Sequence, residues 1–172
     1  MVDQAQRDKP IFKGLTWYRD QHYSLFVPTE TPSAKWPDGR EGVLFQPDVE
    51  DNQTLLGVEV KELDITFSAD DQNDLKEGFL EGIEALTDCT LEEEKNWVVG
   101  DTICLEAKFT YLEAERKQKR WIRVFYKNNR QITLIAQGSS EEAFAYWMPV
   151  FYEAMMTARV HDQKPELKSV TD

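Results

Sequence analysis

The sequence has few of the residues on which common catalytic and metal sites depend. Its 172 residues include only two cysteines and two histidines. It contains no Cys-x-x-Cys pair, so a structural zinc site is not expected. The Ser-centred hydrolase motif, the His-Glu zinc motif, the glycine-rich phosphate loop and the EF-hand loop are also missing. We therefore predict no catalytic residue, no metal ligand and no cofactor.

Long apolar segments are missing as well. No run approaches the roughly 18 residues that a membrane-spanning helix needs. The residues from Met1 to Asp8 have neither an apolar signal core nor transit-peptide character, which predicts a cytoplasmic protein. A hairpin turning at 99–101 would place Cys104 opposite about Lys95, too far from Cys89 for a disulfide. Both cysteines are therefore expected to be free thiols.

Basic charge is scarce, because 20 Lys and Arg stand against 32 Asp and Glu, a formal net charge of −12. This balance disfavours nucleic acids and anionic membranes as partners, since both attract basic surfaces. However, the segment 116–130 holds seven basic residues and no acidic one. Either these side chains solvate a sheet edge, or they form a contact surface for an acidic protein partner, such as a second copy of this chain. The candidate contact residues are Arg116, Lys117, Lys119, Arg120, Lys127 and Arg130.

The rest of the composition is that of one folded domain. Hydrophobic residues make up 41% of the chain and aromatic residues 12%, which excludes wholesale disorder. The length fits about one domain. We place it at residues 13–160, between a flexible polar arm (1–12) and a flexible polar tail (161–172).

The first half of the chain predicts three strands followed by a helix. The strands are 23–28, 42–46 and 54–63, the last with clear alternation of apolar and polar residues. Ser68 is a suitable N-cap for a helix over 70–86. Gly78 and Gly82 form a flat strip on this helix, and we expect this strip to let the helix approach the sheet closely.

The second half predicts a meander and a closing helix. Its strands are 90–98, at an edge of the sheet, then 102–111, 120–126 and 132–137, with a basic loop over 112–119. Apolar residues occupy both faces of the last two strands, so the sheet must be covered on both sides. A second helix, capped near Ser140 and kinked at Pro149, supplies the second cover. The fold class is α+β, with an antiparallel sheet between helices in the order βββ-α-βββ(β)-α.

One polar group falls on an otherwise apolar face of the sheet. Glu106, Lys108 and Arg123 share that face with Trp121. Arg123 is expected opposite either Glu106 or Lys108, and we favour Glu106, because that register avoids placing like charges opposite each other. Two interpretations are open. The three residues either form a half-buried ion pair beneath a helix, or line the polar floor of a pocket for a small ligand.

The order of elements resembles the PsbP-like superfamily, which includes the photosystem subunit PsbP, the Ran-binding Mog proteins and many bacterial proteins. The segment Tyr23–Pro28 is similar to the family's opening strand, and Trp36 is similar to the tryptophan that follows it. The resemblance covers about residues 16–160 and implies the α/β/α fold. It transfers no Ran-binding or metal site, because no motif for either is matched.

These observations leave two functional hypotheses. The first is a non-enzymatic binding or accessory module that acts through protein–protein contacts, as a monomer or a weak homodimer. The second is a small-ligand-binding protein or enzyme that uses the region of Glu106 and Arg123.

Overall fold

The computed structural model describes residue 10 and residues 13–161. The expected arm (1–12) and tail (161–172) therefore lie outside the described residues, except for Pro10 and His161. Neither helix in the described part of the chain has the length and hydropathy needed to cross a bilayer.

The first half of the chain contains five strands and a helix. They are β1 (Leu15–Arg19), β2 (Tyr23–Pro28), β3 (Ser33–Ala34), β4 (Gly42–Phe45) and β5 (Leu55–Glu62), followed by a 3₁₀ turn (Ala69–Asp71) and α1 (Gln72–Glu84). The predicted helix over 70–86 is present but shorter, because a 3₁₀ turn precedes α1 and the helix ends at Glu84. Ser68 caps this turn, and its backbone N–H donates a hydrogen bond of 2.8 Å to the carboxylate of Asp71.

The second half supplies four long strands, a helix and a short strand. They are β6 (Thr90–Val99), β7 (Thr102–Glu113), β8 (Arg116–Lys127), β9 (Arg130–Gly138), α2 (Glu141–Thr157) and β10 (Arg159–Val160). Ser140 caps α2 by accepting a 3.0 Å hydrogen bond from the backbone N–H of Ala143, and the helix runs through Pro149.

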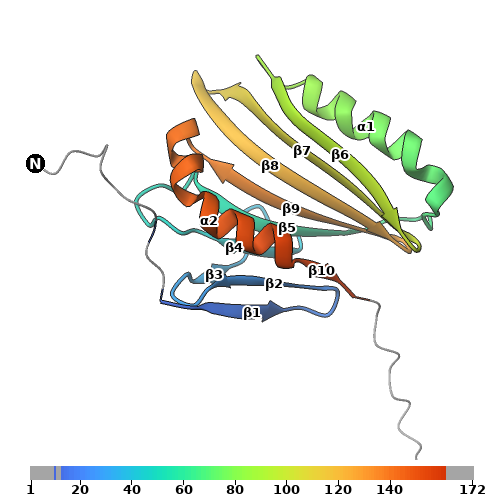
Figure 1. Cartoon of the computed structure of the whole chain (residues 1–172), viewed down its shortest axis with the longest axis horizontal. Helices are drawn as coiled ribbons and strands as arrows, with labels where there is room; N and C mark the ends of the chain where they lie inside the picture. Colours follow the sequence, from blue (N-terminus) through green and yellow to red (C-terminus); the bar gives the residue numbers. More distant parts are fainter. Residues whose placement is uncertain (1–9, 11–12, 162–172) are drawn as a thin grey trace, which may run out of the picture.

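The strands form two sheets rather than one. The larger sheet has seven strands in the order β3-β4-β5-β9-β8-β7-β6, and the smaller one has the order β1-β2-β10 (Figure 1). The expectation of one antiparallel sheet was wrong for residues 23–28, since β2 pairs with β1 and β10 instead of β4. Periodicity identifies a strand, but it does not say which strand will be its neighbour.

The expected basic loop over 112–119 is also wrong, because β7 and β8 continue through it. They are joined only by Ala114 and Glu115, whose φ angles are 48° and 63°. Neither residue is a usual choice for such a left-handed turn, so the sequence carried no hairpin signal there. In β6 and β7, Cys104 lies opposite Trp97 rather than Lys95, and both cysteines are free.

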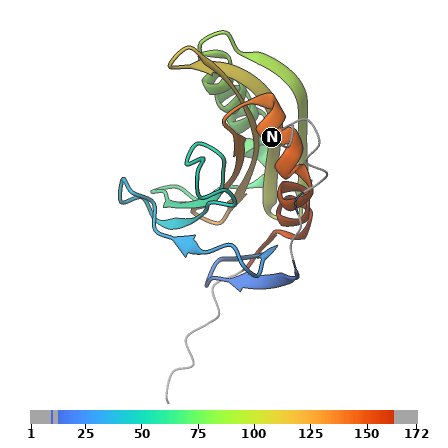
Figure 2. The same cartoon turned by 90° about the vertical axis from the view of Figure 1, so that its left-hand side faces the viewer.

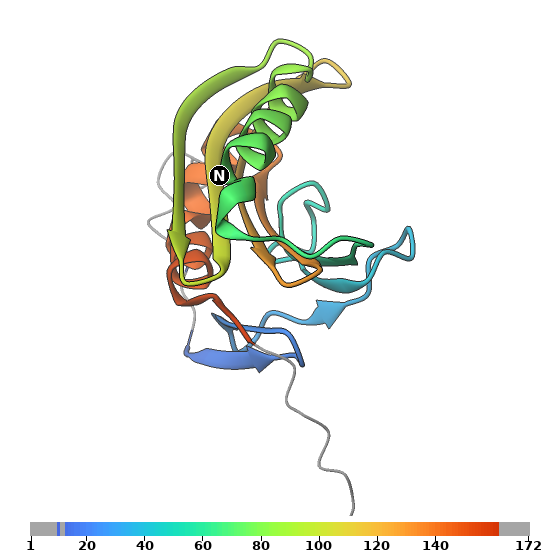
Figure 3. The same ribbon diagram turned by 90° about the vertical axis from the view of Figure 1, so that its right-hand side faces the viewer.

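The two helices cover opposite faces of the large sheet, as predicted. The sheet is curved, with α2 on its outer side and α1 inside the curve (Figures 2 and 3). On the α2 face, Trp121 and Leu134 are buried against Phe151 and the small sheet. On the α1 face, Val124 and Tyr126 are buried with half-buried side chains of the helix. The covering is unequal, because α1 packs mainly over β6 and β7.

Candidate groove between α1 and the sheet

The unequal cover leaves a groove of about 500 Å³ between α1 and the strands β8, β9 and β5. The groove is lined mainly by apolar side chains, such as Leu75 and Phe79 of α1 and Ile122 of β8. A volume of this size and a lining of this kind are typical of sites for small ligands.

The glycines of α1 form part of the wall of this groove. A Cβ atom added at Gly78 or Gly82 would meet no atom within 4 Å, apart from the helix's own neighbouring backbone. The expectation that these glycines bring the helix close to the sheet was therefore wrong. The helix instead packs through its Leu75, Phe79 and Ile83 face, and the glycines keep the adjacent space open.

The floor of the groove follows from strand alternation. Ile122, Val124 and Tyr126 lie on one face of β8, while Trp121 and Phe125 lie on the other. On β9, Thr133 points into the groove beside Val124, its partner in the register. The floor thus combines a hydrophobic strip with a few hydroxyl and amide groups.

The loop that carries Trp36 packs on β5, on the same face of the sheet as the groove. Trp36 is buried and donates its indole N–H to the carbonyl oxygen of Val58 at 2.9 Å. Its ring rests on Gly57, where a Cβ atom would come within 2.3 Å of it. The close approach explains why position 57 requires glycine.

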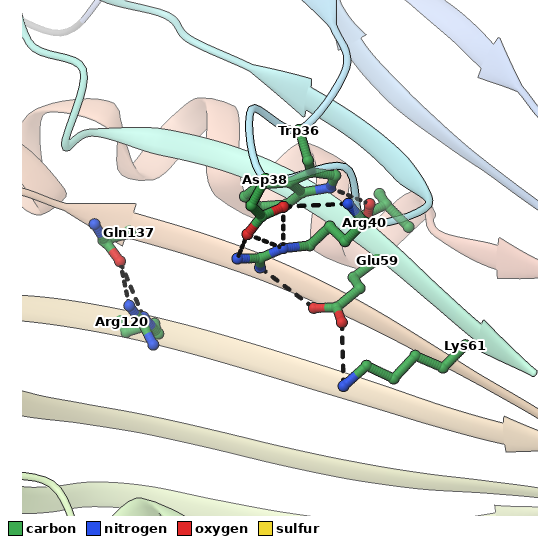
Figure 4. A network of polar contacts seen from close by, with 8 residues as sticks. Trp36, Asp38, Arg40, Glu59, Lys61, Arg120 and Gln137 are labelled. Carbon is green, nitrogen blue, oxygen red and sulfur yellow. Dashed lines mark hydrogen bonds and ion pairs between the residues drawn. The ribbon is translucent and has the colours of Figure 1, made fainter. Parts of the chain in front are cut away.

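Charged side chains form a network on this loop (Figure 4). Arg40 lies over the ring of Trp36 at 4.3 Å and pairs with both Asp38 and Glu59. Glu59 also pairs with Lys61 at 3.2 Å. The hydrogen bond from Arg40 holds the pKa of Asp38 below its usual value. Glu59, which lines the groove, is therefore paired with two cationic side chains, Arg40 and Lys61.

Arg120 also lines the groove, and Figure 4 shows its side chain directed at that of Gln137. Its Nε donates to Oε1 of Gln137 at 3.0 Å and its Nη2 donates to the same atom and to the hydroxyl of Tyr111, at 2.6 and 2.5 Å. Gln137 and Tyr111 are both buried, and Gln137 is anchored by donating to the carbonyl oxygen of Gln53 at 2.7 Å. Burial raises the pKa of Tyr111, while Arg120 acts in the opposite direction.

The predicted polar group near Glu106 lies on the other face of the sheet, under α2. Arg123 is directly opposite Glu106, which confirms the predicted register. Nη2 of Arg123 is 3.2 Å from Glu106, and Nη1 donates to the carbonyl oxygen of Met155 in α2 at 2.6 Å. Lys108 lies over the ring of Trp121 and pairs with Glu93. None of the three candidate residues lines the α1 groove.

The predicted basic contact residues are not brought together on one face. Along β8, Lys117 and Lys119 point to the α2 side, whereas Arg120 points to the α1 side. Acidic partners lie close to several of them. The pairs are Lys117 with Glu141, Lys119 with Glu92, and Arg130 with Glu62, at 3.6, 2.8 and 3.4 Å. Arg116 is exposed at the start of β8, and Lys127 closes the same strand at its other end.

No family model and no curated protein sequence matches the chain. Solved structures do match it. Cyanobacterial PsbP from Synechocystis sp. PCC 6803 aligns with 90% of this chain and 99% of its own, with 15% identity and a TM-score of 0.56. This chain has the PsbP-like fold.

Two further structures share this PsbP-like fold. LpqN of Mycobacterium tuberculosis, involved in cell envelope biogenesis, aligns over 87% of this chain and 91% of its own, with 10% identity and a TM-score of 0.59. PA94 of Pseudomonas aeruginosa, a protein of unknown function and putative regulator, aligns over 88% and 98%, with 13% identity and a TM-score of 0.54. At these identities the comparisons establish the fold alone.

The α1 groove was not predicted from the sequence. The signal that could have indicated it is the pair of glycines, since each weakens a helix by about 1 kcal/mol relative to alanine. Close packing was the expected reason for tolerating that loss. The spacing of Gly78 and Gly82 does not reveal whether the strip meets the sheet or an open space.

Proposed function

We propose that this PsbP-like chain is a non-catalytic binding protein that holds a small, mainly apolar ligand in the α1 groove. The observation that carries the proposal is the groove itself, about 500 Å³ in volume and open where Gly78 and Gly82 lack side chains. Half-buried Ile122 and Phe79 in its lining would lose their remaining contact with water when a ligand binds. Burial of apolar surface is favourable by about 25 cal/mol per Å².

A neutral apolar dye, N-phenyl-1-naphthylamine, tests this proposal through its fluorescence. We expect saturable binding to the wild-type protein. The double variant Gly78→Leu/Gly82→Leu places two side chains in the groove. Their Cβ atoms would have no neighbour within 4 Å, so the variant is expected to stay folded. We expect it to bind the dye at least about tenfold more weakly, a loss of about 1.4 kcal/mol.

The matched control is Asn73→Leu, which adds the same side chain to an exposed position of the same helix outside the groove. This variant is expected to bind the dye as the wild type does. The proposal is wrong if the wild-type protein shows no saturable binding, or if the glycine variant and the control bind equally well.

A second candidate function is protein–protein contact through the tip of the β7–β8 hairpin. Arg116 and Lys117 are exposed there, next to the tight turn at Ala114 and Glu115, on a chain of net charge −12. A double charge reversal, Arg116→Glu/Lys117→Glu, should abolish association with an acidic partner or with a second copy of the chain. Light scattering over a salt series measures self-association, and a salt-independent monomer would count against that form of contact.

A further inference from the structure

The polar groups of the α1 groove are distributed unevenly along its length. Arg120 lies at the end near Phe109 and Leu86, whereas Asp74 and Leu75 lie at the end near Tyr126. The strand positions 120 and 126 are separated by about 20 Å, at about 3.3 Å per residue. A ligand in the groove would therefore meet a cation at one end and apolar side chains along the middle.

Arg120 differs from the neighbouring basic residues of β8 in its partners. Lys117, Lys119 and Arg123 each have a carboxylate within 4 Å. Within the described part of the chain, no carboxylate lies within 4 Å of the Arg120 guanidinium. Its hydrogen bonds go to the neutral side chains of Gln137 and Tyr111. The acidic side chain of Glu113 reaches the hydroxyl of Tyr111 at 3.5 Å rather than the guanidinium, so Arg120 has no direct ion pair.

The position of Arg120 is fixed by a buried network. Gln137 and Tyr111 are only 4% and 3% exposed, and each accepts a hydrogen bond from the guanidinium of Arg120. Gln118, also buried, accepts a hydrogen bond of 2.8 Å from the hydroxyl of Tyr111. A cation held in one orientation loses little conformational freedom when it binds an anion, which favours binding.

The acidic side chains that line the groove do not neutralise the positive charge of Arg120. Glu59 is already paired with Arg40 and with Lys61, at 3.4 and 3.2 Å. Asp74 is exposed and belongs to the end of the groove near Tyr126. The charge complementarity therefore favours a ligand whose single negative group lies at the Arg120 end.

We propose that the α1 groove binds an amphipathic carboxylate, with its acid group on Arg120 and its hydrocarbon chain along Ile122 and Val124. This inference rests on the proposed function, since it assigns the chemistry of the ligand for the same groove. A carboxylate accepts strong, charge-assisted hydrogen bonds from a guanidinium. The hydrocarbon chain buries against the strip of β8 and the helix α1.

A matched pair of probes tests the inference, namely decanoate and decan-1-ol, measured below the concentrations at which they aggregate. Both have the same chain length, so they differ only in the head group. We expect the wild-type protein to bind decanoate at least about tenfold more tightly than the alcohol, since hydrogen bonds to charged groups contribute more than neutral ones. Displacement of N-phenyl-1-naphthylamine reports both affinities.

The variant Arg120→Met keeps the apolar stem and removes the charge, so it should bind the two probes equally. Arg19→Met is the matched control, because it removes an exposed arginine at the end of β1, outside the groove; it should retain the preference for the acid. The comparison of acid with alcohol on the wild-type protein needs no variant, so it remains informative if Arg120→Met fails to fold.

The possible failures are distinguishable. If the wild-type protein binds both probes equally, or if Arg120→Met keeps the preference for decanoate, the carboxylate inference is wrong and the proposed binding function stands. If neither the dye nor either probe binds, the proposed function itself is wrong, and the inference falls with it.

Discussion

Arg123 lies directly opposite Glu106 on the neighbouring strand, and both side chains are buried beneath α2. The same carboxylate oxygen of Glu106 also accepts a 2.6 Å hydrogen bond from the indole N–H of Trp121. Arg123 reaches past the sheet to the backbone of α2 at Met155. The pair therefore joins two strands and a helix, which is the geometry of a structural contact.

We predict that Arg123→Ala destabilises the protein by about 3–5 kcal/mol, because it leaves the buried Glu106 carboxylate without its cation. Urea denaturation measures this loss. The double variant Glu106→Leu/Arg123→Met should recover most of the stability, since an apolar pair removes both buried charges. Loss of dye binding by folded Arg123→Ala at an unchanged melting temperature would instead support a ligand pocket at this pair.

A second prediction concerns the glycines of α1. Gly78→Ala and Gly82→Ala should each stabilise the protein by about 1 kcal/mol, because alanine favours the helix and its Cβ atom meets open space. Thermal denaturation of the single variants checks this. Destabilisation by either alanine would show that the helix approaches its neighbours more closely than the structure indicates.

A third prediction concerns the thiols. Burial raises the pKa of Cys104 to about 12 and also raises that of Cys89, which is only half-buried. Because the thiolate is the reactive form, iodoacetamide at neutral pH should modify Cys89 slowly and leave Cys104 unmodified in the folded protein. Mass spectrometry of the digested protein locates the label. Rapid labelling of Cys104 under native conditions would contradict its burial in β7.

A fourth prediction concerns the link between the loop before β5 and the start of α2. Burial acts to raise the pKa of Asp51, but hydrogen bonds from the hydroxyls of Ser139 and Thr54 and from the backbone of Gln53 outweigh it and lower the pKa below 3.8. The folded protein thus binds this proton less tightly than the unfolded chain, so the stabilisation is present above the usual pKa and lost as pH falls through the lowered one.

Asp51→Asn should therefore be less stable than the wild type near neutral pH, and the difference should shrink below about pH 4. Urea denaturation near neutral pH and below about pH 4 measures this difference in stability. Asp48→Asn is the control, because Asp48 caps the neighbouring turn by accepting a hydrogen bond from the backbone of Glu50, outside this hydroxyl cluster. An equal loss for Asp51→Asn at both pH values would contradict the ionic origin of the effect.

The sequence predicts those parts of the fold that depend on local patterns. Alternation in 54–63 and 102–111 identified two central strands, and charge pairing placed Arg123 opposite Glu106. The small sheet was missed, because β2 and β10 are brought together by the packing of the whole chain rather than by a local pattern.

The α1 groove depends on the same kind of long-range information. Whether Gly78 meets a strand or an open space is decided by how α1 packs over β6 and β7. The surroundings of Arg120 likewise come from three strands and a loop, since Tyr111, Gln137 and Gln53 all contribute. A charge count placed this arginine in a basic cluster, but only the register shows that it points away from its lysine neighbours.

The most direct test of the binding site is an NMR titration of the ¹⁵N-labelled protein with decanoate. We predict that the amide signals of Gly78, Gly82 and Thr133 shift in a saturable manner, while those of Met155 in α2 stay in place. Saturable shifts confined to the α2 face, or none at all, would contradict the assignment of the α1 groove as the ligand site.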